Sequence, residues 1–268
     1  MNAPVLRDNE FQLFQKLIFE LAGLSMSTTK KPLVGNRLAK RLRYYECETY
    51  LEYYQIISDF ENEEEKQVFV DLLTTNETSF FREPIHFDFM RENILPRHET
   101  GDPFRIWSAA CSSGEEPYSI GMILEDKLRG GNWQIIASDI SSRVLEKSQE
   151  GLYPIDKSNK IPVEYLKKYC LKGVKTQLGY FKISDLIKKK IQFKSINLNE
   201  HFPNIGKFHI IFLRNVMIYF NKDTRIRLID QMASHLNQGG YLFIGHSETL
   251  LDITDKLVMV KPTIYKKK

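Results

Sequence analysis

A loop of small residues, two carboxylates and a proline carries the most specific chemistry in this sequence. The loop, Ala109-Ala-Cys-Ser-Ser-Gly-Glu-Glu-Pro117, follows a short apolar run. Small side chains let a backbone approach a ligand closely, Gly114 can adopt a positive φ, and Pro117 suits the first turn of a helix. Glu115 and Glu116 stand where a pyrophosphate would need positive potential, and the loop is not GxGxxG. It therefore favours a cationic or neutral ligand, although both acids alone would equally suit the dipole of a helix N-terminus.

A further acid lies where a ribose would be held. Asp139 ends the apolar run 134–138. An acidic residue about 20 residues beyond a glycine loop accepts hydrogen bonds from ribose hydroxyls. Taken alone, Asp139 could instead cap the helix that follows. Together the loop and this acid predict an adenosine without phosphates, which indicates S-adenosylmethionine as the cofactor.

Alternating strands and helices must bring these residues to one edge of a sheet. Apolar runs predict strands at 105–110, 134–138, 191–196, 208–213 and 241–244, with helices at 118–128, 143–149 and 224–236. This alternation is typical of a parallel sheet with right-handed crossovers. Ligands of such sheets bind at the carboxyl ends of the strands, where the polar motifs fall.

The first 75 residues follow a different pattern. Apolar residues recur at helical spacing from Phe11 to Leu21, and residues 10–73 show no strand alternation. We expect an all-α N-terminal domain at 1–75 and a Rossmann-like α/β domain at 76–268. Between 151 and 190 the alternation is interrupted, which predicts a small antiparallel β insertion at about 165–193. Lys266 to Lys268 are expected to be a frayed terminus.

Composition excludes several classes of protein. The 268 residues are 27% charged and 12% aromatic, which argues against disorder. No apolar run approaches the roughly 20 residues of a membrane span, and the N-terminus lacks the apolar core of a signal peptide. Three scattered cysteines suit a reducing cytoplasm. His201, His209 and His246 match no zinc spacing, so no metal is expected.

Basic residues gather on one predicted helix face. Arg37, Lys40 and Arg43 recur at helical spacing within a segment that has no acid, and an acidic segment follows from Glu46 to Glu65. The face could dock an acidic partner, or it could be a solvated face beside that acidic segment. Nucleic acid is the weaker interpretation, because the net charge is only +4 and no zinc or helix-turn-helix signature accompanies the cluster.

Five segments of the sequence resemble the chemotaxis-receptor glutamate methyltransferase family, which is of the CheR type. They are Thr74–Glu83 (TTNETSFFRE), Ile106–Ser119 (IWSAACSSGEEPYS), Ala137–Ile140 (ASDI), Arg214–Asn221 (RNVMIYFN) and Gly245–Glu248 (GHSE). The match is ordered and runs from about residue 10 to 265, and the segment Asn36–Arg43 resembles the family's receptor-facing helix. The resemblance implies an S-adenosylmethionine-dependent enzyme that forms glutamate methyl esters on the cytoplasmic helices of bacterial chemotaxis receptors.

The resemblance also implies roles for individual residues. Arg82 and Tyr219 would place the methyl group and the incoming carboxylate, and Arg37, Lys40 and Arg43 would dock the acidic methylation helices. The insertion would be the family's small β-subdomain, which in some members docks a peptide from the receptor's C-terminus. The cofactor would be held by Asn76, Thr78, Arg82, Glu116, Asp139, Asn197, Leu198, Arg214 and Asn215.

Several alternatives remain open at this level. A glutamate carboxylate is ionised at pH 7 and needs no general base, so catalysis would rest on positioning. Tyr219 could instead be a core aromatic, and Arg82 could form a surface ion pair with Glu77 or Glu83. The chain could methylate another protein or a small molecule, or bind S-adenosylmethionine without turnover; a NAD-dependent dehydrogenase fits least. Nothing indicates an obligate oligomer, so we expect a monomer.

Overall fold

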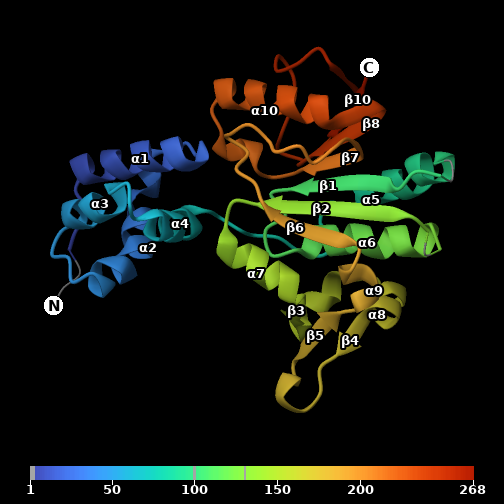
Figure 1. Ribbon diagram of the computed structural model, residues 1–268, viewed down its shortest axis with the longest axis horizontal. Helices are drawn as coiled ribbons and strands as arrows, with labels where there is room; N and C mark the ends of the chain where they lie inside the picture. The colour runs from blue at the N-terminus through green and yellow to red at the C-terminus, as the bar shows by residue number, and fades with distance from the viewer. Residues whose placement is uncertain (1–3, 99–100, 130) are drawn as a thin grey trace.

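The computed structural model of the chain describes residues 4–98, 101–129 and 131–268 and divides into a helical part and a sheet-containing part (Figure 1). The helical part comprises α1 (Asp8–Ala22), α2 (Lys31–Tyr44), α3 (Tyr50–Ser58) and α4 (Glu63–Leu73), with a short 3₁₀ turn η1 (Thr28–Lys30). The predicted boundary near residue 75 falls in the segment that joins α4 to α5 (Pro84–Phe89). No described helix has the length and apolar content needed to cross a bilayer.

The helical part buries a core of its own. Phe14 of α1 is 1% exposed, and its ring lies 6.2 Å from that of Tyr53 and 5.8 Å from that of Phe69. The apolar spacing that predicted this helix therefore marks its buried face. α1 ends at Gly23, whose φ of 70° is the left-handed conformation that closes many helices.

A seven-stranded sheet forms the second part. Its order is β6-β2-β1-β7-β8-β10-β9, in which the first five strands are parallel and β10 and β9 are antiparallel to their neighbours. The bounds are β1 Phe104–Ala109, β2 Trp133–Asp139, β6 Ile191–Ser195, β7 Phe208–Leu213, β8 Leu236–Ile244, β9 Leu257–Lys261 and β10 Ile264–Lys267. The predicted Rossmann-like α/β class is confirmed.

Helices cover both faces of this sheet (Figure 1). Successive side chains of a strand point to opposite faces, so Ile106 joins the core beneath α6 (Glu115–Lys127) while Trp107 joins the core beneath α10 (Lys222–His235). The helices α7 (Ser142–Glu150) and α5 contribute Leu145 and Phe87 to the first of these cores. The strands are buried on both faces, which fixes the loops at their ends.

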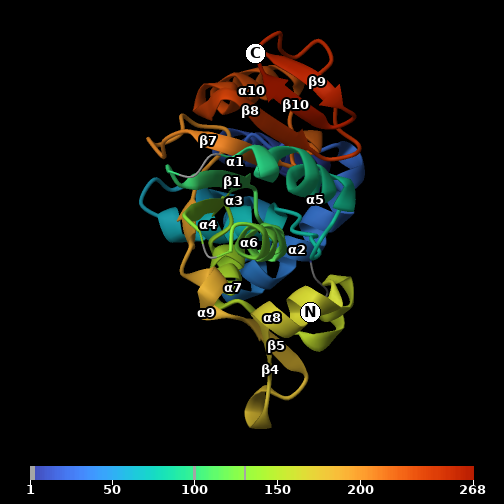
Figure 2. The same ribbon diagram turned by 90° about the vertical axis from the view of Figure 1, so that its right-hand side faces the viewer.

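A second, three-stranded sheet projects from the body (Figures 1 and 2). Its order is β3-β5-β4, with β3 Leu152–Pro154, β5 Tyr180–Ile183 and β4 Cys170–Lys172 all antiparallel. The turn η4 (Ile155–Lys160), α8 (Val163–Tyr169), the turn η5 (Lys175–Gln177) and α9 (Asp185–Lys188) complete it. The unit starts earlier than the predicted insertion at 165–193, and residues 191–193 belong instead to β6, which pairs with β2.

The expectation of a frayed C-terminus was wrong. β9 and β10 form a hairpin that extends the main sheet, and Ile264 is 0% exposed where it pairs with Phe243 of β8. The buried Ile264 and Tyr265 hold this end of the chain, and Lys267 Nζ donates to the carbonyls of Ala233 and Leu236 at 2.6 and 2.9 Å. The short helix α5, the π-helical turn η2 (Met90–Ile94) and the turn η3 (Leu95–Arg97) were also not predicted.

Candidate active site

A cavity of about 400 Å³ lies between the helical part and the carboxyl ends of the parallel strands. Its position between β1 and β7 is the point where the strand order reverses, which is where open α/β sheets bind ligands. Its volume falls within the range typical of small-molecule sites. Every residue that the resemblance assigned to the cofactor or to catalysis lines it: Asn76, Thr78, Arg82, Glu116, Asp139, Asn197, Leu198, Arg214, Asn215 and Tyr219.

The loop after β1 lines the cavity and contains residues with unusual backbone conformations. Ala110 and Ser112 both have positive φ, at 59° and 50°, which is uncommon for residues other than glycine. Gly114 has a φ of 92°, and a Cβ there would lie 2.9 Å from Tyr153 Oη. The shape of the loop therefore requires a glycine at position 114, and its positive φ confirms the prediction from the sequence.

Asp139 is held at the end of β2 by backbone donors. Its Oδ2 accepts the N–H of Ser112 at 2.8 Å and its Oδ1 accepts the N–H of Ser141 at 3.0 Å. The residue is 6% exposed, and this burial raises the pKa of its carboxyl group. Each carboxylate oxygen has two lone pairs, so acceptor capacity remains for two ligand hydroxyls. The N-cap of α7 is Ser141, so Asp139 itself is not the capping residue.

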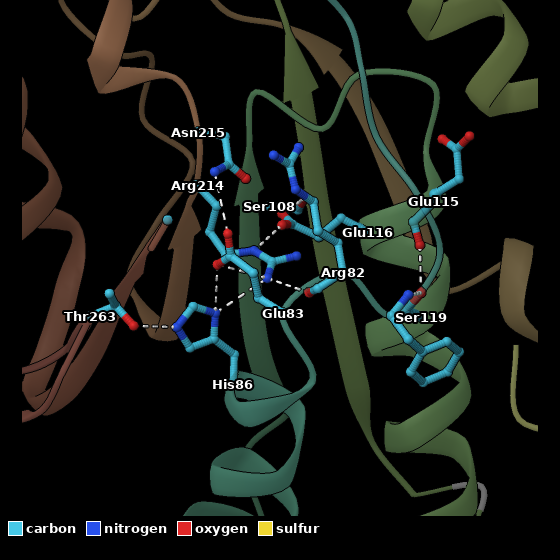
Figure 3. A network of polar contacts seen from close by, with 12 residues as sticks. Arg82, Glu83, His86, Ser108, Glu115, Glu116, Ser119, Arg214, Asn215 and Thr263 are labelled. Atoms are coloured by element: carbon cyan, nitrogen blue, oxygen red, sulfur yellow. Dashed lines mark hydrogen bonds and ion pairs between the residues drawn. The ribbon is translucent and has the colours of Figure 1, made fainter. Parts of the chain in front are cut away.

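Glu116 and Arg214 form a buried ion pair in the cavity wall (Figure 3). Arg214 Nε donates to Glu116 Oε2 at 2.6 Å, and Ser108 Oγ donates to Glu116 Oε1 at 2.6 Å. Glu115 is also buried, at 0% exposed, but it is paired with Lys157 and does not line the cavity. Of the two acids in this loop, only Glu116 lines the cavity, and it is the one that the resemblance assigned to the cofactor.

Arg82 and Tyr219 both line the cavity. Arg82 is half-buried, and its Nη1 donates to the carbonyl of Glu77 at 3.1 Å. Tyr219 ends the 3₁₀ turn η6 (Met217–Tyr219) after β7, and its carbonyl accepts the N–H of Ser25 at 2.8 Å. The cavity thus brings together an arginine and a tyrosine from segments far apart in the chain.

The remaining wall follows β6 and β7. Asn197 Nδ2 donates to the carbonyl of Leu21 at the end of α1 at 2.7 Å, so its amide also ties the two parts together. Leu198 is 7% exposed and supplies an apolar surface. Asn215 has a φ of 58°, and its backbone N–H donates to Glu248 Oε2 at 2.9 Å.

Glu248 is a supporting residue that residue-by-residue reasoning did not single out. Its carboxylate also accepts the N–H groups of Met217 at 2.8 Å and Gly245 at 2.6 Å, so it braces the loop that carries Asn215. Burial raises the pKa of this carboxyl group. A Cβ on Gly245 would lie 2.5 Å from Asn215 Nδ2, which explains the glycine. The GHSE segment was the signal that could have revealed it.

Three side chains of metal-ligating type cluster beside Arg214. Glu83, His86 and His246 place their ligand atoms within 4.8 Å of one another. The guanidinium of Arg214 already lies among them, with Nη1 3.5 Å from Glu83 Oε2 and 3.2 Å from His86 Nδ1. A cation would meet a buried positive charge there, so no metal chemistry is derived from this cluster.

The basic face of α2 divides into exposed and structural residues. Lys40 and Arg43 are exposed, as docking would require. Arg37 instead donates through Nη1 to the carbonyls of Leu72, Leu73 and Thr74 at 3.0, 3.1 and 2.9 Å. Burial lowers the pKa of its guanidinium. The structure therefore gives Arg37 a role at the end of α4 that its spacing on the helix did not reveal.

The fold and the cavity define an α/β protein that binds a small ligand at the switch point of a parallel sheet. Comparison with known families specifies the class. Residues 76–266 match the family described as "CheR methyltransferase, SAM binding domain", and residues 9–74 match "CheR methyltransferase, all-alpha domain". The chain belongs to the CheR methyltransferase family, whose cofactor is S-adenosylmethionine.

Individual relatives are similar over nearly their whole length. A chemotaxis protein methyltransferase of Salmonella typhimurium is 36% identical over 263 residues, which cover 97% of this chain and 90% of the relative. One from Borreliella burgdorferi is 37% identical over 278 residues, which cover 100% and 96%. Among solved structures, the glycopeptide N-methyltransferase MtfA with sinefungin shares 12% identity and a TM-score of 0.37, over 65% of this chain and 53% of its own. That last likeness is too weak to assign a function.

Proposed function

We propose that this chain is a protein-glutamate O-methyltransferase that forms methyl esters on the acidic cytoplasmic helices of a chemotaxis receptor. One observation carries the proposal: a single cavity holds Asp139 and Glu116, suited to the cofactor, beside Arg82 and Tyr219, suited to the incoming carboxylate. Membership of the methyltransferase family gives the reaction type, and Arg82 and Tyr219 support a carboxylate as the acceptor.

The residues present fit S-adenosylmethionine. Asp139 keeps acceptor capacity for ribose hydroxyls, Leu198 offers an apolar wall, and Glu116 is an acid for the positively charged methionine portion. When bound, this cofactor supplies a methyl group whose bond to sulfur breaks, the electron pair staying on sulfur, as the glutamate oxygen forms the ester bond. The chain needs no general base, because the attacking carboxylate is already ionised at neutral pH.

The role of the protein is then to position the acceptor carboxylate and the cofactor relative to each other. The planar guanidinium of Arg82 can hold a carboxylate through parallel hydrogen bonds, and the ring of Tyr219 can face a cationic sulfur. Holding reactants in a near-attack geometry can supply about 7–11 kcal/mol of the barrier. Arg82 must still leave the carboxylate reactive, since stabilising the ground state alone gains no rate.

The partner surfaces are part of the same proposal. Lys40 and Arg43 are exposed on α2 and would meet acidic receptor helices. The strand β4 lies at the edge of the small sheet, where an extended peptide from a receptor C-terminus could add as a further strand. We propose a cytoplasmic monomer, in keeping with a partner that presents cytoplasmic helices.

Calorimetric titration with S-adenosylmethionine and S-adenosylhomocysteine tests the cofactor half of this proposal. We expect both to bind in the micromolar range, and Asp139→Ala to lose that binding while the exposed Asp255→Ala keeps it. Absence of binding by the unmodified chain would contradict the proposal. Activity on free small acids without any receptor would instead support a small-molecule methyltransferase.

A further inference from the structure

His86 lies between Arg214, which lines the cavity, and Thr263 of the C-terminal hairpin, and it contacts both residues (Figure 3). The residue is 0% exposed, its Nε2 lies 2.7 Å from Thr263 Oγ1, and its Nδ1 lies 3.2 Å from Arg214 Nη1. We propose that Thr263 fixes the tautomer of His86 so that Nδ1 accepts a hydrogen bond from Arg214, and that this relay positions Arg82 for methyl transfer. The last step rests on the function proposed for Arg82.

The directions of the hydrogen bonds follow from the hydrogens available. Thr263 Oγ1 lies 2.6 Å from the carbonyl of Pro262, which can only accept, so the single hydroxyl hydrogen points there. Thr263 Oγ1 must then accept from His86, which places a hydrogen on Nε2. A neutral imidazole carries one such hydrogen, so its Nδ1 is left with a lone pair. Arg214 can only donate, and that lone pair faces its Nη1.

The surroundings of His86 keep its imidazole neutral. Burial, followed by the positive charge of Arg214, lowers the pKa of His86 to about 3. The other titratable groups that face it are Glu83, with Oε2 3.5 Å from Nδ1, and His246, whose ring centroid is 5.8 Å away. A protonated His86 would present a donor to the donor on Arg214, so the relay needs the neutral form.

The relay reaches Arg82 through the guanidinium of Arg214. The same Nη1 that faces His86 donates to the carbonyl of Arg82 at 2.6 Å, while Nε donates to Glu116. A planar guanidinium held at both ends has a fixed orientation. The next residue, Glu83, has a φ of 58°, so the chain turns sharply just where Arg214 holds it. His86 does not line the cavity, so its role in this proposal is that of a positioning residue.

The backbone conformation of Thr263 is a second observation that supports its role. It sits in the turn between β9 and β10 with a φ of 65°, a conformation that β-branched residues rarely adopt. Glycine or asparagine would form such a turn more readily. What threonine adds is the hydroxyl that meets His86. The backbone carbonyl of Thr263 also accepts the N–H of Ile244 at 3.0 Å, which ties the turn to β8.

Imidazole nitrogen spectroscopy on the full chain, combined with turnover, tests the relay. In the unmodified protein we expect His86 to carry its hydrogen on Nε2 and to stay neutral down to about pH 5. Thr263→Val keeps the β-branch and removes the hydroxyl. It should shift His86 toward the other tautomer and lower kcat about tenfold, with the KM for S-adenosylmethionine changed less than about twofold. Thr263→Ser should restore both, and Thr254→Val should change neither.

Several results would overturn the relay. A hydrogen on Nδ1 of His86 in the unmodified protein would do so without any variant, even if Thr263→Val did not fold. Unchanged turnover in a folded Thr263→Val, or equal loss in Thr263→Ser, would remove the role of the hydroxyl. Failure of the unmodified protein to bind S-adenosylmethionine would instead contradict the proposed function, since the tautomer is measured without activity.

Discussion

The carboxylate of Asp139 is buried, and burial disfavours its ionised form. Burial raises the pKa of its carboxyl group, and the hydrogen bonds that it accepts from two backbone N–H groups lower that pKa. Such a balance is common where a residue must remain ionised and still hold a ligand. Its acceptor capacity depends on that ionisation, because a protonated carboxyl group becomes a donor at one oxygen.

The affinity for S-adenosylhomocysteine should therefore decrease as the pH is lowered. Because the pKa of Asp139 is raised, the carboxylate is lost on acidification earlier than an ordinary aspartate would be, and the ribose hydroxyls lose an acceptor. We expect the dissociation constant, measured by calorimetry from neutral pH down to about pH 5, to rise in the unmodified protein. Asp139→Asn should bind weakly with little dependence on pH over that range. An identical pH dependence in both proteins would contradict this account.

Arg82 tests whether orientation of the carboxylate matters. Arg82→Lys keeps the positive charge but replaces the planar fork by a single ammonium group. We expect kcat/KM for a receptor fragment to fall about 10- to 100-fold, and the dissociation constant of S-adenosylhomocysteine to change less than about threefold. Arg97→Lys, at an exposed position, is the matched control. A loss of cofactor affinity as large as the loss of activity would move Arg82 from catalysis to binding.

At the scale of elements, the side chain of Arg37 joins α2 to the end of α4. Arg37 of α2 donates to three carbonyls at the end of α4, which have no partner within their own helix. The interaction works like a C-terminal cap supplied from a neighbouring helix, and the positive charge suits the negative end of α4. It stabilises the segment that leads to Asn76 and Thr78 in the cavity wall.

Arg37→Met should reduce stability. It removes the donor and leaves carbonyls at the end of α4 without it, so we expect the free energy of unfolding to fall by about 1–3 kcal/mol. Urea denaturation followed by circular dichroism measures this change. Lys40→Met, one turn further along the same helix and exposed, should alter the midpoint little. Equal effects of the two substitutions would refute the capping role.

The sequence could predict elements whose burial shows in their own residues. The runs 134–138 and 208–213 are apolar because both faces of these strands are covered, so their positions followed from composition alone. The C-terminal hairpin could not be predicted from the sequence, because Val258, Met259 and Val260 of β9 are exposed and β10 is rich in lysine. These segments become strands only because β10 pairs with β8 and β9 pairs with β10, and a local sequence pattern does not show such pairing.

The same distinction applies to the site. Asp139 and the loop after β1 could be inferred because a strand end and its ligand loop are local features. The relay from Thr263 through His86 to Arg214 joins three separated segments, and no spacing in the sequence indicates it. The capping role of Arg37 was invisible for the same reason. Helical spacing shows which residues share a face but not which of them meet a neighbouring helix.

In the whole molecule, the helical part closes the cavity rather than standing apart from it. Gln67 Nε2 donates to the carbonyl of Ile140 at 3.0 Å, and Ser142 Oγ donates to Asp71 at 2.8 Å. Ser25, just beyond α1, binds the carbonyl of Tyr219. The exposed Lys40 and Arg43 are thus carried by a part of the molecule that also forms the site wall.

Reversing this exposed charge should weaken receptor methylation alone. For Lys40→Glu combined with Arg43→Glu, we expect the KM for an acidic receptor fragment to rise about tenfold at low salt, since electrostatic attraction to the fragment becomes repulsion. The difference from the unmodified protein should shrink as salt is added. Cofactor affinity should not change. The control is Lys127→Glu with Lys147→Glu, which changes the net charge equally at exposed sites on α6 and α7. An equal rise in KM for the control would dismiss specific docking.

Transfer of a labelled methyl group from S-adenosylmethionine to a receptor cytoplasmic fragment is the most direct test of the central claim. The account predicts label in the receptor that is released as methanol by mild alkali, as expected of a glutamate methyl ester. Replacing the acceptor glutamates by alanine should abolish it. Label that resists alkali, or none in the receptor despite tight cofactor binding, would contradict a protein-glutamate methyltransferase.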